Sequence, residues 1–452
     1  MDRPKRSAEP GLVRRLTLGR TLAGATGALL LALGVTIPAV AAGGPLDESF
    51  GGDGKVTTNF TPRFDSASSV AATPNGNIVA VGMAGFGGPN PTFALARYGH
   101  DGSLDSTFGG DGKVTTNFTG EQDNALAVAL QPNGKVVAAG GAGFSDTDFD
   151  TEFAIARYNV DGSLDKCFGG DGKVTTDLSA TYDQVNALAL QRDGKIVVAG
   201  YADAASAHPK FGLARYNRDG TLDKSFGSRG KILTPVRKGA VAFGVAIQSD
   251  GRIVVSGETL LGGSNTGFAL VRYNRSGSLD RTFGRNGKVS TDFTPGSDGN
   301  NAVAIQRDGK IVASGGANTG PHATFALARY NTDGTLDTSF GRDGKVTTAF
   351  TRHGDFAEEG LAIQADRKIV AAGVAGARGA NPTFALARYN DDGTLDTSFG
   401  GDGRLRTDFT PRGDDAIGLV IESDGRIVAV GNAGEAGEGG GDASFALARY
   451  LP

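Results

Sequence analysis

The chain has 452 residues, with 45 lysines and arginines against 49 aspartates and glutamates, and its formal net charge of −4 argues against a nucleic-acid partner. Its single cysteine, Cys167, excludes an intrachain disulfide. Glycine occurs 72 times, and short runs of Val, Ile, Phe and Thr lie between Asp-Gly and Asn-Gly pairs, a pattern typical of β-strands joined by tight turns.

The N-terminal segment has the features of an export signal. A basic head precedes an apolar run over residues 22–42, which ends in the small-residue pattern Ala39-Val40-Ala41. This predicts a signal peptide over residues 1–41 and a secreted, extracellular mature chain without a membrane span. A membrane anchor is the alternative, and Arg14-Arg15 leaves both the general and the twin-arginine export routes open. Cleavage removes six basic and two acidic residues and leaves 39 against 47, a net charge of −8.

Residues 42–452 consist of seven copies of one repeat. The phrase Leu-Asp-x-Ser/Thr/Cys-Phe-Gly recurs at spacings of 57 to 60 residues, and such regularity overrides any count of domains based on length. The copies begin at Leu46, Leu104, Leu164, Leu222, Leu279, Leu336 and Leu395.

Each unit contains four strand candidates, which in the second unit are residues 125–131, 135–140, 153–158 and 172–178. Alanines alternate with leucine and valine in the first candidate, so both of its faces are apolar and the sheet must be covered on both sides. Antiparallel four-stranded sheets stacked around an axis meet this need. The sequence therefore predicts an all-β, seven-bladed β-propeller with four strands per blade. A β-solenoid would also cover both faces, but no atypical cap unit is visible.

The two ends of the chain cut the repeat in complementary places. The N-terminus supplies only a fourth strand, Gly54 to Phe60, and the C-terminus supplies the first three strands, at residues 416–421, 426–431 and 445–450. Together they make one complete blade. We therefore expect the N-terminal strand to close the ring as the outer strand of the C-terminal blade.

Three linked phrases carry a resemblance to a known family. They are LDxSFGxDGKVTT, AxALQxDGKIVVAG and FALARYNxDG, and they recur through residues 46–450. In these phrases the chain resembles the delta-60 repeat proteins, a family of secreted and surface-associated bacterial proteins. The resemblance implies a propeller-type repeat scaffold, and it brings neither an assigned activity nor a catalytic residue.

An arginine recurs in the third strand of every unit, where it alternates with phenylalanine and leucine onto one face. We expect each arginine to lie between blades in a buried structural ion pair with the aspartate of the Leu-Asp phrase. The alternative is an anion-binding site. The arginines are Arg97, Arg157, Arg215, Arg272, Arg329, Arg388 and Arg449, and the aspartates are Asp105, Asp165, Asp223, Asp280, Asp337, Asp396 and, across the ring closure, Asp47.

A carboxylate also recurs just before the first strand of a unit. The residues are Asp65, Asp123, Asp183, Asp298 and Asp414, with Asp355 offset by one position and Ala240 in their place in the fourth unit. A closed ring would gather these side chains near the axis, where Ca²⁺ finds oxygen ligands, so they form a predicted calcium site. The alternative is that each aspartate caps its own turn through backbone N–H groups.

Differences between the units are concentrated in two sets of loops, which open on one face of a propeller, where binding residues usually lie. No two histidines have metal-ligand spacing, and there is no G-x-S-x-G nucleophile motif and no tryptophan. We therefore expect a monomeric, non-catalytic binding module, without a cofactor other than calcium, whose partner is an extracellular protein or glycan. The alternatives are a propeller hydrolase or lyase, metal-assisted or not, with its site at the channel mouth, and a structural cell-surface protein.

Overall fold

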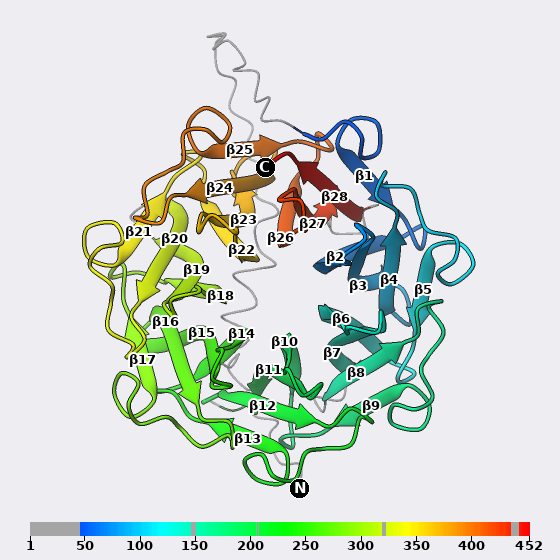
Figure 1. The fold of residues 1–452 in the computed structure, drawn as a ribbon, viewed down its shortest axis with the longest axis horizontal. Helices are drawn as coiled ribbons and strands as arrows, with labels where there is room; N and C mark the ends of the chain where they lie inside the picture. The colour runs from blue at the N-terminus through cyan, green and yellow to red at the C-terminus, as the bar shows by residue number, and fades with distance from the viewer. Residues whose placement is uncertain (1–45, 146–150, 205, 207, 319–321, 435–442) are drawn as a thin grey trace, which may run out of the picture.

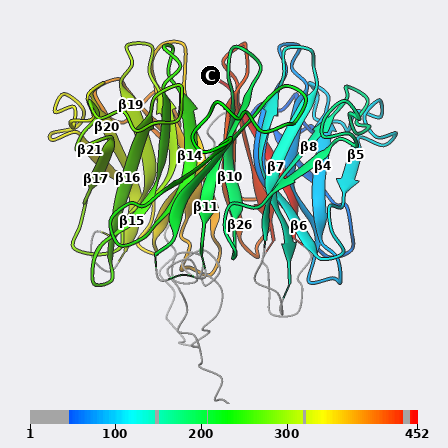
Figure 2. The same cartoon turned by 90° about the horizontal axis from the view of Figure 1, so that it is seen from below.

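The computed structural model describes residues 46–145, 151–204, 206, 208–318, 322–434 and 443–452. These residues form seven four-stranded antiparallel sheets, and no helix among them is long and apolar enough to cross a membrane. The sheets stand around one axis as the blades of a propeller (Figure 1), and their connecting loops lie on two opposite faces (Figure 2). The predicted all-β, seven-bladed fold is confirmed. The predicted signal peptide, residues 1–41, lies outside the described residues.

The strands of a blade follow one another from the axis outward, and we number the blades 1 to 7 from the one that begins with β2 (Figure 1). The inner strands are β2 (Phe64–Ala72), β6 (Gln122–Leu130), β10 (Gln184–Leu190), β14 (Ala240–Ile247), β18 (Gly299–Ile305), β22 (Asp355–Ile363) and β26 (Asp414–Ile421). The second strands are β3 (Ile78–Phe86), β7 (Val136–Phe144), β11 (Ile196–Ala202), β15 (Ile253–Gly262), β19 (Ile311–Asn318), β23 (Ile369–Ala375) and β27 (Ile427–Ala433). The third strands are β4 (Thr92–Tyr98), β8 (Glu152–Tyr158), β12 (Lys210–Tyr216), β16 (Asn265–Tyr273), β20 (Ala323–Tyr330), β24 (Thr383–Tyr389) and β28 (Ser444–Tyr450). The outer strands are β5 (Lys113–Thr116), β9 (Lys173–Thr176), β13 (Lys231–Thr234), β17 (Lys288–Thr291), β21 (Lys345–Thr348), β25 (Arg404–Thr407) and, in blade 7, β1 (Lys55–Thr58).

The ring closes as the sequence predicts. Strand β1 pairs antiparallel with β28, and the Asp47 N–H donates to the carbonyl of Arg449 at 2.8 Å, as the Asp105 N–H does to Arg97 at 2.9 Å within blade 1. The closing strand has four residues instead of the seven expected, because the Phe60 N–H donates to Asp65 at 2.7 Å and no longer points to β28. The N-terminal strand therefore completes the C-terminal blade.

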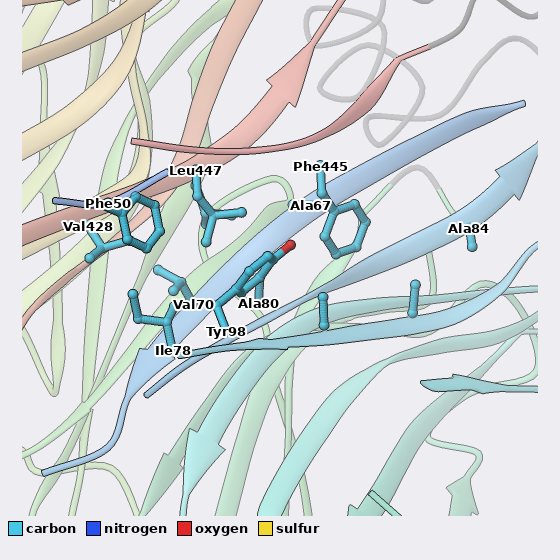
Figure 3. Close-up of a cluster of buried hydrophobic side chains, with 13 residues drawn as sticks. Phe50, Ala67, Val70, Ile78, Ala80, Ala84, Tyr98, Val428, Phe445 and Leu447 are labelled. Atoms are coloured by element: carbon cyan, nitrogen blue, oxygen red, sulfur yellow. The ribbon is translucent and has the colours of Figure 1, made fainter. Parts of the chain in front are cut away.

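The core lies between blades, where the facing sheets bury their side chains. Figure 3 shows the contact of blade 7 with blade 1, in which Phe50 and Leu447 pack with Ala67, Ala80 and Tyr98, all fully buried. The aromatic residues Phe50, Phe445 and Tyr98 lie on or beside the third and outer strands, whereas the alanines come from all of the first three strands of blade 1. Because radially arranged sheets diverge away from the axis, large side chains on the outer strands fill the wider part of the gap.

In six blades the repeated arginine links the blade to the next one. In blade 5, Arg329 is 3 % exposed, and its Nε lies 2.7 Å from Asp337 Oδ2, while Nη1 donates to the backbone carbonyl of Asp391 in blade 6. The Nε–Oδ2 distance is 2.6 to 2.8 Å in all seven blades, which confirms the predicted ion pair. The guanidinium also lies over the ring of Phe340, 4.7 Å from its centroid. The arginine is thus a structural residue.

Tyrosine and lysine of the repeat make further links between blades. The Tyr330 hydroxyl of blade 5 donates to Thr291 Oγ1 of blade 4 at 2.8 Å, and the same pair recurs around the ring. On the outer strand of blade 5, Lys345 Nζ donates to the carbonyl of Asp292 at 3.4 Å. The repeated polar residues are therefore used in assembling the ring.

We expect Arg329→Ala to lower the free energy of unfolding by about 3 to 5 kcal/mol, because it leaves the buried Asp337 carboxylate with Lys310 as its one cation, at 2.9 Å, and removes the donor to the Asp391 carbonyl. Urea denaturation followed by circular dichroism measures the effect. Arg342→Ala is the control, since Arg342 is exposed and should change stability by less than about 0.5 kcal/mol. An Arg329→Ala protein as stable as the control would contradict the structural role.

One buried carboxylate at the closing blade lacks hydrogen bonds. Glu422 follows β26 in blade 7 and is 5 % exposed, and neither of its carboxylate oxygens accepts a hydrogen bond within the described part of the chain. The nearest cationic atom is Arg449 Nη1 at 3.8 Å, and Arg449 is already paired with Asp47. Burial raises the pKa of Glu422, against the opposing charge of Arg449. The corresponding residue is glutamine in five blades, at Gln131, Gln191, Gln248, Gln306 and Gln364.

Glu422→Gln should therefore stabilise the protein, by roughly 1 to 3 kcal/mol at neutral pH, the cost of a buried unsatisfied group. The folded-state pKa of Glu422 is raised, so its ionised carboxylate lowers the stability of the folded protein above that pKa. This loss of stability disappears below the ordinary pKa of 4.5, where Glu422 is protonated in both the folded and the unfolded protein. Melting temperatures of parent and variant should then converge as the pH falls toward 4.5. The reverse substitution in blade 6, Gln364→Glu, should destabilise; a neutral effect of both changes would refute this account.

Candidate functional site

The aspartates predicted to bind calcium each lie in a separate turn. In blade 1 the buried Asp65 carboxylate accepts hydrogen bonds from the Phe60, Thr61 and Gly85 N–H groups at 2.7 to 2.9 Å and from Thr61 Oγ1 at 2.9 Å. Similar bonds recur at Asp123, Asp183, Asp298 and Asp414, and at the offset residue Asp355. This geometry favours the alternative interpretation, in which each carboxylate caps its own turn.

Burial nevertheless affects the charge of these aspartates. It raises the pKa of Asp183 to about 6, and it raises the pKa of Asp123, Asp298 and Asp414 above the ordinary value. Within the described ranges, no three His, Cys, Asp or Glu side chains gather into a group that could hold a metal ion. The calcium site stays a prediction.

A more individual feature lies on the inner strands, which surround the axis (Figure 1). Each inner strand has a β-bulge at the same level, where its pairing with the second strand shifts. Six blades have one residue in this bulge: Ser68, Leu126, Asn186, Phe243, Asn301 and Ile417. In blade 6, three residues, 358–360, lie between the pairs Ala357↔Gly373 and Leu361↔Ala371.

The longer bulge of blade 6 brings two glutamates to the inner strands. It explains the one-residue offset of Asp355, because the additional chain lies between that aspartate and the following turn. Glu358 and Glu359 are half-buried, as is Asp415 on β26 of blade 7. Burial, and then the charge of Glu358, raises the pKa of Asp415 to about 7. The sequence interpretation missed Glu358 and Asp415, and the offset of Asp355 was the signal that could have found them.

Asparagine side chains hold this part of the ring in place. Asn301 Nδ2 of blade 5 donates to the Ala357 carbonyl at 2.9 Å, next to the blade 6 bulge. Asn432 Nδ2 donates to Asp415 Oδ2 at 3.4 Å, and Asn432 Oδ1 accepts from the Ala67 N–H of blade 1 at 3.1 Å. The carboxyl of Asp415 is therefore oriented by an amide that also joins blades 7 and 1.

Asp415, whose pKa lies near neutrality beside the Glu358 carboxyl, can gain or lose a proton near pH 7. The pair can bind an amino or hydroxyl group, and it can also exchange a proton with a bound molecule. We therefore take Glu358, Asp415 and Asn432 as the candidate functional site.

Asp415→Asn tests the electrostatics of this site. The pKa of Asp415 is raised from 3.8 to about 7, so its ionisation lowers the stability of the parent as the pH rises between these values and adds no further loss above them. The variant should gain on the order of 2 kcal/mol over the parent at pH 8, because solvent screening of the half-buried carboxyl reduces the roughly 4 kcal/mol that this shift corresponds to, and it should gain nothing at pH 4. Urea denaturation across this range measures the difference. Glu121→Gln, an exposed carboxyl on the loop face, is the control and should show no such trend.

Six segments of the chain match a family described as "Domain of unknown function (DUF5122) beta-propeller", at residues 73–108, 131–168, 191–226, 248–283, 306–340 and 364–399. Each segment runs from the turn after an inner strand to the phenylalanine of the Leu-Asp phrase. No curated protein matches the sequence. The match supports a family of propeller repeats, while the resemblance to delta-60 repeat proteins stays a prediction.

Solved structures that are similar to this chain have low sequence identity to it. A protein of unknown function from Dyadobacter fermentans is 13 % identical with a TM-score of 0.42, and the match covers 88 % of this chain and 98 % of that one. Sqt1 from Chaetomium thermophilum is 13 % identical with a TM-score of 0.45, covering 88 % and 100 %. The NanB sialidase from Streptococcus pneumoniae is 12 % identical with a TM-score of 0.45, covering 92 % and 71 %. Likeness at this level carries no argument about function.

Proposed function

We propose that the protein is a secreted, non-catalytic binding propeller whose ligand contacts Glu358 and Asp415 at the inner strands of blades 6 and 7. Secretion rests on the signal-peptide pattern of residues 1–41. The observation that carries the binding proposal is the lengthened bulge of β22, which brings Glu358 close enough to Asp415 for its charge to raise the pKa of that carboxyl.

Glu358 and Asp415 are not among the residues that recur in the links between blades. The links between blades use the arginine, aspartate, tyrosine and lysine of the repeat, and these residues recur around the ring. Neighbouring carboxyls repel one another, and each is partly removed from water, so the group costs stability. Perturbed carboxyls of this kind cluster at functional sites. The ligand class that they favour is an extracellular glycan or protein segment with amino groups.

Glucosamine and N-acetylglucosamine hexamers test the proposal, because they share a sugar backbone and differ in charge. We expect the protein to bind the glucosamine hexamer more tightly than the N-acetylglucosamine hexamer at about pH 6, because the amino groups are charged there and the acetamido groups are neutral. Isothermal titration calorimetry measures both affinities. The double substitution Glu358→Gln and Asp415→Asn should weaken binding about tenfold or more.

The control is Glu121→Gln, which should leave the affinity unchanged. Equal binding of the two hexamers, or binding that the double substitution does not affect, would argue against a ligand at the carboxyl pair. Binding of neither hexamer would leave a structural cell-surface protein as the better interpretation.

The same carboxyl pair favours a second candidate function, a hydrolase or lyase. A protonated Asp415 can donate its proton to a leaving oxygen while an ionised Glu358 accepts one from water or from the substrate, the usual division between acid and base. The two functions separate in the calorimeter samples. A binding module leaves the hexamers intact, whereas an enzyme releases shorter products that chromatography detects and that Asp415→Asn abolishes.

A further inference from the structure

Blade 4 carries a hollow at its outer rim, away from the carboxyl pair. The hollow has a volume of about 360 Å³ and is lined by Arg237, Leu261, Gly262, Asn265, Ser290 and Asp292. Three segments enclose it: the loop of residues 235–239 that enters blade 4, the β15–β16 hairpin, and the end of β17. All three are fully described, and all three differ in sequence from their counterparts in the other blades.

The first wall exists because the repeat is broken at Ala240. The loop before each of the other six blades is held by a buried aspartate. Blade 4 has no carboxylate there, and Thr259 Oγ1 instead donates to the carbonyls of Val236 and Gly239, at 3.2 and 3.0 Å. The loop takes a different path, with Arg237 at a φ of 48°. A non-glycine residue is seldom left-handed without a local reason.

The second wall is the β15–β16 hairpin, which turns through two residues between the pair Gly262↔Asn265. Its Leu261 folds back over β16 at Gly267, where a Cβ atom would lie only 2.7 Å from Leu261 Cδ1 and from the Thr291 carbonyl. Threonine occupies this position in blades 1, 5 and 6. Glycine therefore makes the space in which Leu261 forms an apolar side of the hollow.

Polar groups in the hollow are left with unused hydrogen-bonding capacity. The exposed Arg237 donates from Nε to Ser290 Oγ at 3.2 Å, and no residue of the described segments accepts a hydrogen bond from its two terminal nitrogens. Asn265 Nδ2 donates to Asp292 Oδ2 at 3.2 Å, while the buried Asn265 Oδ1 accepts no hydrogen bond from any described residue. The hollow thus offers a guanidinium with two free nitrogens and one buried amide oxygen, Asn265 Oδ1, that lacks a donor.

We propose that this hollow binds a uronic acid residue of an acidic polysaccharide. A sugar carboxylate matches the two terminal nitrogens of Arg237 in a bidentate pair. Sugar hydroxyl groups can donate hydrogen bonds to Asn265 Oδ1 and to the Asp292 carboxylate. The C–H face of the sugar ring can pack on Leu261. The charge of Asp292 disfavours a doubly charged phosphate, and a neutral sugar would leave Arg237 without an anion. The volume lies near the lower limit for ligand pockets, roughly 300 Å³, and suits one or two sugar rings.

This inference concerns a different site from the carboxyl pair and does not depend on it. Trigalacturonate and its methyl ester are the probes, because esterification removes the charge and keeps the sugar chain. We expect calorimetry to show that trigalacturonate binds. The ester should bind at least about tenfold more weakly. A galacturonate monomer that binds as tightly as the trimer would assign the hollow to a free sugar acid, contrary to the polysaccharide proposed.

Arg237→Gln should weaken trigalacturonate binding about tenfold or more, and Asn265→Ala should weaken it to a smaller extent. The matched control is Arg412→Gln, an exposed arginine in the loop before blade 7, which should leave the affinity unchanged. Unaltered melting curves would show that the variants are folded. The proposal is wrong if Arg237→Gln binds like the parent, if the ester binds like the acid, or if trigalacturonate gives no heat of binding at millimolar concentration.

Discussion

The buried guanidinium between blades is the constraint on which the rest of the structure depends. A buried guanidinium is tolerated only when its N–H groups find hydrogen-bond acceptors, and a single blade does not supply acceptors for all of them. Arg329 takes Asp337 and Ser339 from its own blade and the Asp391 carbonyl from the next. Six of the arginines make this contact, so a ring opened at any of these six junctions would leave one arginine without its carbonyl.

Ring closure follows from the same constraint. At the junction of blades 7 and 1, Arg449 finds Asp47 and Ser49 near the N-terminus and the carbonyl of His100 in blade 1. The residues that precede β1 supply the carboxylate, so that the closing strand provides charge as well as backbone pairing. At this junction the buried Glu422 stands where five other blades have a glutamine.

The sequence predicted those features that repeat. Strand order, ring closure and the Arg–Asp pairs depend on residue types that recur at fixed spacing, so each copy supports the interpretation of the others. Glu358 and Asp415 were missed because they approach one another across two blades, at a bulge whose length alone distinguishes it. The hollow at Arg237 was missed for a similar reason, since it follows from the loss of an aspartate at Ala240 and from a glycine on a different strand, Gly267. Repetition reveals a scaffold, whereas individual sites arise where several departures from it meet in space.

The joint between β28 and β1 also determines how the ring responds to force. Leu46 and Tyr450 form the same bridge that Leu104 and Tyr98 form inside blade 1, where residues 99–103 connect them covalently. In blade 7 this covalent turn is absent, and both chain segments leave from the same end of the β1–β28 pair. Tension between these two segments acts on the backbone hydrogen bonds one after another, as in a zipper, and does not load them together in shear. The ring is therefore mechanically weakest along this one seam, although the seam is built from the same contacts as the other six.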